Sequence, residues 1–161
     1  MKTDDPRLEK ARKEMQERSD KMDKLTLAAL RSHLVAEQSM NEYIVARGVK
    51  RKWLLNQTFS KKMKKCKLLS KDENNDPLWD VLDSANQLRN AIAHTLSMEK
   101  ISDKMAQLRE KYLASLTEEQ AEGLKDQPDD YIALSACIDC AGFIAMLKMR
   151  SESDDGSMIN P

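Results

Sequence analysis

The sequence has little glycine, proline or aromatic character, and neither sign of charge dominates. Its 161 residues include four glycines, four prolines and 4% aromatic residues, whereas 34% are charged. This composition disfavours a β-sandwich or barrel, which needs many turns and strand-forming aromatic residues, and it favours long amphipathic helices. Lysine and arginine together number 27, as do aspartate and glutamate. The net charge therefore indicates no general affinity for nucleic acid or membranes.

Cysteines and long apolar segments are scarce as well. Three cysteines, an odd number, do not form a disulfide framework, so a reducing, cytoplasmic location is expected. The N-terminal residues lack the apolar core of a signal peptide, and none is predicted. The most apolar stretch, residues 131–149, contains Asp139 and Lys148. Because a charge inside a bilayer is costly, we interpret this stretch as a buried helix and predict no membrane span.

Apolar residues recur at helical spacing along most of the chain, and no segment alternates as a strand does. We therefore predict an all-α protein, an up-and-down bundle of about five to six helices over residues 25–150. Residues 1–24 are predicted to form a charged helical extension with a thin apolar seam, and residues 151–161 a flexible tail. The seam consists of Leu8, Met15 and Met22.

Capping residues mark several helix ends. Asp5 followed by Pro6 indicates a helix start, and Gly48 a helix end. Thr117 fits a capping box and begins a short helix. Pro128 breaks the chain before the last predicted helix, which is expected to end near Arg150.

Residues 50–71 carry nine lysines and arginines and no acidic residue. The second half of this segment has the spacing of an amphipathic helix, with an apolar face of Phe59, Met63, Cys66 and Leu69. Clustered cations bind phosphates by releasing counterions, although a merely solvated surface is an equal alternative. The candidates for RNA or phosphate binding are Lys61, Lys62, Lys64, Lys65 and Lys67. Trp53 is the candidate for base stacking, and Phe59 is expected in the core.

The helix predicted over residues 77–96 carries an arginine where an apolar residue belongs. At about 100° per residue, Arg89 falls inside the apolar arc of this helix. The edge of that arc is lined by Asn86, Asn90 and His94. An isolated buried charge is costly, so Arg89 must face a cleft or an acidic partner. Glu37 and Asp139 both interrupt apolar faces and are alternative partners, and a purely structural ion pair would explain either contact.

Cys137 and Cys140 form a C-x-x-C sequence in the last predicted helix. A metal site normally needs a second pair of ligands, and a redox site needs a thioredoxin-like setting. The neighbouring residues are small and apolar, so we predict that both cysteines pack in the core. No metal site and no cofactor are predicted.

Arg89-Asn90 and His94 form the motif R-N-x-x-x-H late in a helix. Glu37 lies in an early helix, and the basic segment FSKKMKKCKLL precedes the motif helix. With these features, residues 25–97 resemble the HEPN superfamily, whose members include ribonuclease toxins of prokaryotic defence systems and non-catalytic modules. The region is also similar to mannitol-repressor-type proteins, which implies a role in regulation, including that of transcription, without catalysis.

The HEPN resemblance implies metal-independent endoribonuclease activity, in which the RNA 2′-hydroxyl attacks the adjacent phosphate. His94 would exchange protons, Arg89 would bind phosphate through paired N–H donors, and Asn90 would orient one of these groups. Supporting roles would fall to Glu37 and Asn86. The resemblance also implies a homodimer, because cleavage needs both an acid and a base. The only other histidine, His33, is expected at the surface.

The resemblance further implies a protein partner, either an antitoxin or a regulatory protein. In toxins neutralised by a partner nucleotidyltransferase, a tyrosine often follows closely after the motif histidine. Thr95 and Leu96 stand there instead, so that form of control is not indicated. A non-catalytic module would instead bind its partner through an exposed apolar groove.

Overall fold

The computed structural model describes residues 5–95 and 97–156, which are almost entirely helical and contain no strand. The elements are α1 (Pro6–Ala46), α2 (Arg51–Leu54), α3 (Phe59–Leu69), the 3-10 helix η1 (Lys71–Glu73), α4 (Leu78–His94), α5 (Met98–Ala114), α6 (Glu118–Leu124) and α7 (Asp129–Gly156). The all-α prediction is confirmed. The described residues form seven α-helices, more than the five to six expected, because the four-residue α2 was not predicted, whereas α6 begins after Thr117 as expected.

The predicted capping residues define several of these ends. The Asp5 side chain accepts a hydrogen bond from the Arg7 backbone N–H at 2.9 Å, with a proline in the first turn. Gly48 has φ +82°, a left-handed conformation that glycine adopts without strain, and it lets the chain leave α1. Thr117 and Gln120 form a complete capping box at the start of α6.

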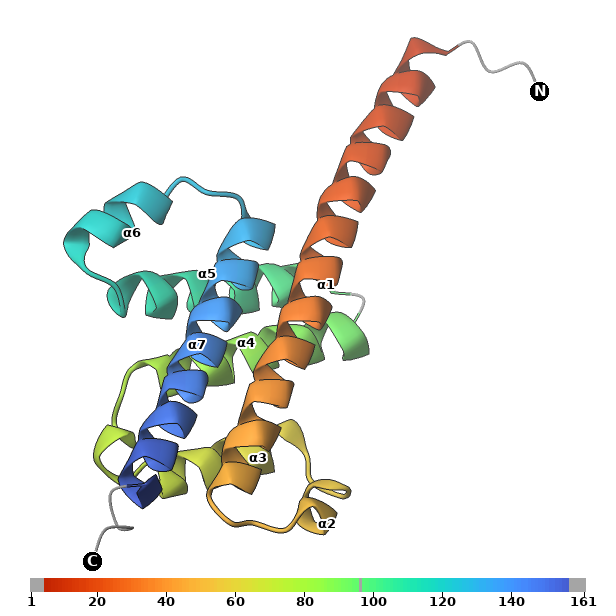
Figure 1. Ribbon diagram of the computed structural model, residues 1–161. Coiled ribbons are helices and arrows are strands. Elements are labelled where there is room, and N and C mark those ends of the chain that lie inside the picture. Colours follow the sequence, from red (N-terminus) through yellow and green to blue (C-terminus); the bar gives the residue numbers. More distant parts are fainter. Residues whose placement is uncertain (1–4, 96, 157–161) are drawn as a thin grey trace, which may run out of the picture.

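The helices lie in two layers (Figure 1). The long helices α1 and α7 lie side by side and run in the same direction, while α3, α4 and α5 lie behind them, with α4 and α5 crossing them. Glu42 and Lys148 join the long helices through an ion pair of 3.5 Å. Parallel neighbours distinguish this bundle from a simple up-and-down arrangement, and the connection from α1 to α7 passes through the whole second layer.

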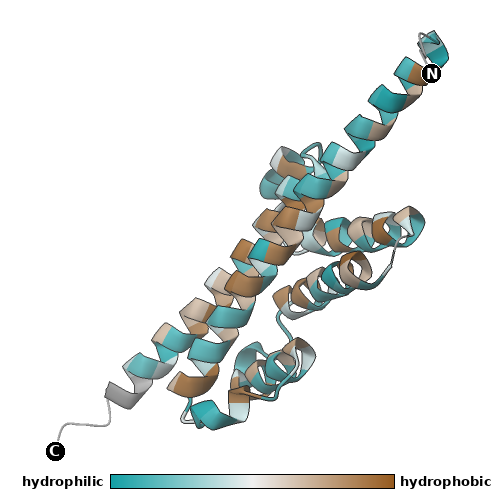
Figure 2. Cartoon of the chain, turned by 90° about the vertical axis from the view of Figure 1, so that its right-hand side faces the viewer, coloured by the Kyte–Doolittle hydropathy of each residue, from teal (hydrophilic) through white to brown (hydrophobic). Residues whose placement is uncertain are grey.

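The N-terminal half of α1 extends beyond the rest of the molecule (Figures 1 and 2). Residues 9–21 are all exposed, and the first buried residue of α1 is Leu25. The predicted extension and the bundle thus share one continuous helix of 41 residues. At the other end, α7 continues to Gly156, past the expected end near Arg150.

The core lies between the two layers, where the apolar faces of the helices meet (Figure 2). Trp79 of α4 is its largest fully buried side chain and meets Phe143 of α7 edge to face, with ring centroids 5.4 Å apart. Cys137 and Cys140 are buried in this core, as predicted. Between Asp129 and Ser153, α7 is long and apolar enough to cross a membrane, but 44% of its most apolar window is buried in the bundle.

Candidate functional site

The motif lies on α4, which starts and ends at clear local signals. The Asp76 side chain accepts a hydrogen bond from the Leu78 backbone N–H at 2.9 Å and caps the first turn. Apolar residues on one face anchor the helix in the core, among them Val81, Leu82 and Leu88. The helix ends at His94, and the next residue, Thr95, has an extended backbone. The rigid, buried face of α4 therefore fixes the direction in which the motif side chains project.

Arg89 is half-buried, and its contacts differ from both predicted ion pairs. Its Nη1 donates to the Asn90 side-chain oxygen at 3.2 Å, and neither Glu37 nor Asp139 forms an ion pair with it among the described residues. The Nε atom of Arg89 is buried and has no hydrogen-bond partner in the described part of the chain. A buried donor without an acceptor costs about 1–3 kcal/mol, which an anionic ligand would offset.

Both candidate acids have other partners. Glu37 accepts a hydrogen bond from the Lys62 ammonium at 2.6 Å, and Lys62 is buried between α1 and α3. Asp139 accepts from the Tyr112 hydroxyl at 2.6 Å. The prediction that Lys62 belongs to an RNA-binding surface is therefore wrong, because its charge is used inside the bundle to neutralise Glu37.

His33 is buried, contrary to the predicted surface position. Its ring stacks on Phe59, with centroids 4.0 Å apart, and its Nε2 lies 3.2 Å from the side-chain oxygen of Asn86. The amide nitrogen of Asn86 donates to Ser60 at 3.3 Å. Since the amide oxygen can only accept, the Nε2 of His33 carries the proton that is donated. Asn86 thus connects the motif helix to α1 and α3 and makes no hydrogen bond to Arg89 or His94 among the described residues.

Burial lowers the pKa of His33 below its ordinary value of 6.5, because the imidazolium loses hydration. The hydrogen bond to Asn86 opposes this shift, the nearby charge of Arg89 adds to it, and Glu37 opposes it. These influences place His33, Glu37 and Arg89 in one electrostatic environment where α1 meets the motif helix. His33 is therefore a neutral, structural histidine of the site.

We expect the stability of the protein to depend on the protonation of His33. The pKa of His33 is lower in the folded protein than in the unfolded chain, so the unfolded chain takes up a proton at higher pH. The contribution of neutral His33 to the free energy of unfolding is therefore complete above pH 6.5 and is lost as the pH falls below that value. Chemical denaturation at pH 7.5 and at pH 5 measures the loss. In His33→Gln, which cannot titrate there, the free energy of unfolding should fall less between these pH values. An equal fall in both proteins contradicts this assignment.

His94 and Asn90 are exposed, two and one turns beyond Asn86 on the same edge of α4. His94 is the last residue of the helix, so its ring is open to a ligand. Asn90 reaches Arg89 but not His94 through a hydrogen bond. Asn90 and His94 thus lie along one edge of α4, the motif edge. Arg89, about 140° round the helix from His94, reaches this edge through its hydrogen bond to Asn90. His33, Asn86 and Ser60 form a structural layer beneath it.

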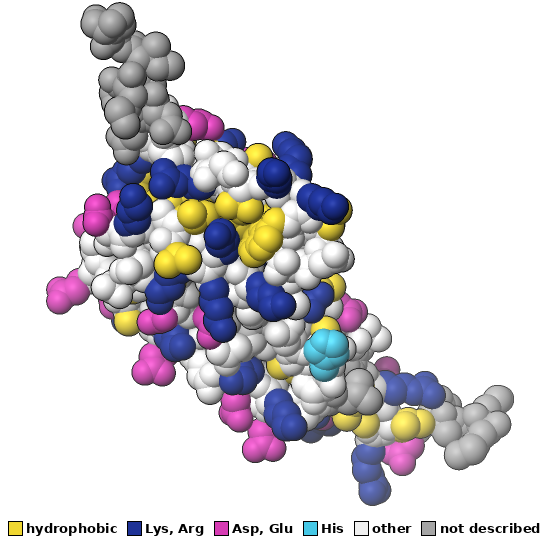
Figure 3. Space-filling view, turned by 90° about the horizontal axis from the view of Figure 1, so that it is seen from below, with side chains coloured by type: hydrophobic (Ala, Val, Ile, Leu, Met, Phe, Trp, Pro, Cys, Tyr) yellow, Lys and Arg dark blue, Asp and Glu magenta, His cyan; other side chains and the backbone are white. Residues whose placement is uncertain are grey.

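The basic surface surrounds an apolar patch on the lower face of the molecule, where α2 and α3 lie (Figure 3). Lys61 and Lys64 are exposed, and Lys65 and Lys67 are half-exposed. Lys65 lies over the Trp53 ring, 5.9 Å from its centroid. The Trp53 ring is half-buried, so part of it packs against the core and part of it remains at the surface. Phe59 is a core residue, as predicted.

The first turn of α3 connects this basic surface to the motif helix. Ser60, directly before Lys61, accepts the hydrogen bond from Asn86. Arg89 and Asn90 follow Asn86 by about one turn of α4. Lys61 therefore begins the basic surface directly after the residue that Asn86 contacts.

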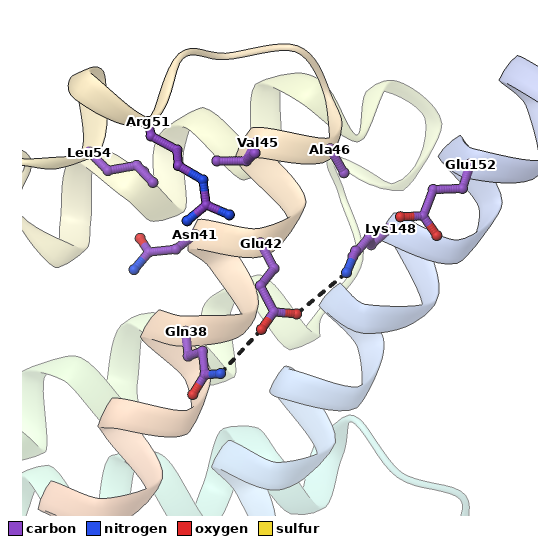
Figure 4. Close-up of a pocket in the computed structure, with 9 residues that line it drawn as sticks. All are labelled: Gln38, Asn41, Glu42, Val45, Ala46, Arg51, Leu54, Lys148 and Glu152. Atoms are coloured by element: carbon purple, nitrogen blue, oxygen red, sulfur yellow. Dashed lines mark hydrogen bonds and ion pairs between the residues drawn. The ribbon is translucent and has the colours of Figure 1, made fainter.

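A surface cavity of about 470 Å³ lies elsewhere, where α1, α2 and α7 meet (Figure 4). Arg51 points into it, and the ion pair of Glu42 with Lys148 crosses one side. None of the residues predicted to form the site lines this cavity. Its two acidic and two basic side chains balance each other, so the cavity has no excess positive charge to bind a phosphate.

The sequence prediction did not give His33, Ser60 or Lys62 the structural role that each has at this site. A helical-wheel signal existed for two of them. His33 lies one turn before Glu37 and shares its inward face, and Lys62 lies between Phe59 and Cys66 on the apolar face of α3. Ser60 carried no such signal, because its role depends on the crossing of two helices.

Comparison of the chain with family models, with curated proteins and with solved structures gave no match.

Proposed function

We propose that this protein is a cytoplasmic, metal-independent endoribonuclease of HEPN type, with Arg89, Asn90 and His94 as its catalytic residues. The observation that carries the proposal is the state of Arg89, which is half-buried, has an unpartnered Nε among the described residues and is hydrogen-bonded to Asn90, on the helix edge that also carries the exposed His94. A structural arginine at this depth would be expected to pair with an acid. An arginine that binds phosphate keeps its donors available.

The chemistry assigns a role to each motif residue. His94 removes the proton of the ribose 2′-hydroxyl, whose oxygen attacks the adjacent phosphorus and displaces the 5′-oxygen, leaving a 2′,3′-cyclic phosphate. Arg89 stabilises the negative charge that develops on the phosphoryl oxygens. Asn90 holds the guanidinium through the hydrogen bond of 3.2 Å and so orients the phosphate.

The departing 5′-oxygen needs a proton donor. His33 does not serve, because it is buried and its Nε2 proton is donated to Asn86. In our proposal a second copy of the chain supplies its own His94, as the HEPN resemblance implies for a homodimer. The exposed position of His94 at the end of α4 leaves it accessible to such a copy.

The activity is tested by incubating the purified protein with a mixed RNA pool in EDTA. Cleavage products that end in 2′,3′-cyclic phosphate, and that persist after chelation, support the proposal. If the protein is folded and the RNA concentration exceeds the dissociation constant measured for RNA binding, RNA that stays intact overturns the proposal. An activity that disappears in EDTA also contradicts the metal-independent mechanism.

A non-catalytic regulatory module is the second candidate function, and exposed apolar residues on α1 favour it. Leu27, Leu30 and Leu34 are exposed and lie on one stripe of α1. Such a stripe fits an antitoxin or regulatory protein. If RNA stays intact and Leu34→Asp abolishes binding of a protein partner while His94→Ala does not, the second function holds.

Contacts of RNA with the basic surface should appear in the salt dependence of binding. Replacing Lys61 and Lys64 together with glutamine removes two exposed charges from α3. For single-stranded RNA, we expect the slope of log affinity against log salt to become less steep by about 1.4, since each phosphate contact contributes about 0.7. Lys10 and Lys13, equally spaced and exposed on α1, provide the matched control. An equal change in both variants contradicts a specific RNA-binding surface on α3.

A further inference from the structure

Residues 6–24 of α1, hereafter the arm, are exposed except for Leu8, which is half-exposed, and Met22, which packs against the edge of the core. Its apolar stripe continues the core-facing stripe of α1, because Leu8, Met15 and Met22 lie at the same helical angle as the buried Met40. Met15 is 59% exposed. A charged helix of this length is marginally stable by itself in water, so the arm is suited to packing against another surface.

The bundle does not supply that surface. Ser32 lies against Cys137, and Glu42 pairs with Lys148, so α7 runs parallel to α1 in constant register. That register places the start of α7, at Asp129, level with about Lys24. The cover that α7 gives to α1 therefore ends where the arm begins, as Figure 1 shows.

A second uncovered stripe lies on α7. It faces away from the core and is apolar or small along its length: Tyr131, Leu134, Ile138, Gly142, Ala145 and Met149, all exposed. It spans about 27 Å, and the arm about 28 Å, at 1.5 Å per residue. The two stripes share a seven-residue repeat, at 8, 15 and 22 on the arm and at 131, 138 and 145 on α7. In one copy they cannot meet, because the arm points away from α7.

We propose that two copies exchange arms, so that the arm of each copy packs antiparallel on the α7 stripe of the other. A two-fold axis near Lys24, perpendicular to α1, produces this arrangement. In this register Leu8 lies opposite Ala145, Met15 lies opposite Ile138 and next to the small Gly142, and Met22 lies opposite Tyr131. The flexible Met15 side chain can fill the space over Gly142. With the two stripes centred on each other, Arg18, which interrupts the apolar stripe of the arm, lies within about a turn of the exposed Asp139. This packing covers both apolar stripes, and Arg18 of the arm gains Asp139 as a counter-charge.

Arm exchange is independent of the proposed ribonuclease activity, and it uses a face of the molecule other than the motif edge of α4. A second copy can therefore still pair at the motif edge. The mass of the oligomer should fall by half when the arm contact is lost, whether the remaining species is a dimer joined through α4 or a monomer. RNA cleavage and arm exchange can thus fail separately.

Light scattering of the full chain and cysteine cross-linking test the proposal. Met15→Asp and Ile138→Asp should each halve the mass and raise the dissociation constant at least tenfold, whereas Lys13→Asp, on the opposite side of the arm, should change neither. Circular dichroism confirms that each variant is folded. A chain carrying both Met15→Cys and Ile138→Cys should form covalent dimers with a short bismaleimide, and neither single variant should do so. Covalent dimers of Met15→Cys alone would show that arms pair with arms, and a monomeric wild-type chain would equally overturn arm exchange.

Discussion

His94→Ala should lower the rate of RNA cleavage by about 100- to 10,000-fold, the range that positioned acid–base groups contribute. The side chain is exposed at the end of α4, so its removal should leave the free energy of unfolding almost unchanged. Initial rates on one RNA substrate in EDTA measure the effect. Asp80→Ala, also exposed but in the first turn of the same helix, is the control and should retain the wild-type rate.

Arg89→Lys makes the same experiment more specific. Lysine keeps the charge but loses the planar pair of donors that binds two phosphate oxygens. We expect a loss of about 100-fold in the cleavage rate, similar to the loss of one donor to a developing oxyanion, with a much smaller change in RNA affinity. If lysine supports full activity, the guanidinium is not the phosphate-binding group that we propose.

Glu37→Met should destabilise the protein by about 3 kcal/mol, because it leaves the Lys62 ammonium buried without a counter-charge. Lys62→Met should cost only about 1 kcal/mol, since the carboxylate left behind reaches water. The exposed fractions of the side chains support this asymmetry, at 8% for Lys62 and 28% for Glu37. Denaturant titration of both variants gives the two values.

The double variant completes this test. With both charges replaced by methionine, no buried charge remains unpaired, and the cost should return to about that of Lys62→Met alone. If the loss of unfolding free energy in the double variant equals the sum of the two single losses, a direct pairing of Glu37 with Lys62 is contradicted. Equal costs for the two single variants would contradict the argument from burial.

The sequence predicts the helices of this protein better than their crossings. Caps such as Asp5 and Thr117 act within one turn, so local spacing identifies them. The burial of Cys137 and Cys140 follows from their apolar neighbours on one helix. By contrast, the parallel pairing of α1 with α7 depends on contacts between distant segments, which no local pattern records.

The candidate site shows the same limit at the level of single side chains. Helical angles correctly place Glu37 and Arg89 on inward-facing arcs, but they cannot tell which of several inward charges meet. Lys62 reaches Glu37 because α3 packs against α1 at that level, and Arg89 is left with its neighbour Asn90. His33 was expected at the surface because histidine is often exposed, although its position one turn before Glu37 already indicated the inward face.

The central claim is that RNA binds at the edge of α4 that carries Asn90 and His94, which Arg89 reaches through Asn90. NMR spectra of the two histidine rings, recorded during titration with an uncleavable 2′-O-methyl RNA, test it most directly, and His94→Ala assigns the signals. Our account predicts that the ring signals of His94 shift on binding, while those of His33, buried beneath Asn86, move far less. RNA binding that leaves the His94 signals unchanged would contradict the account.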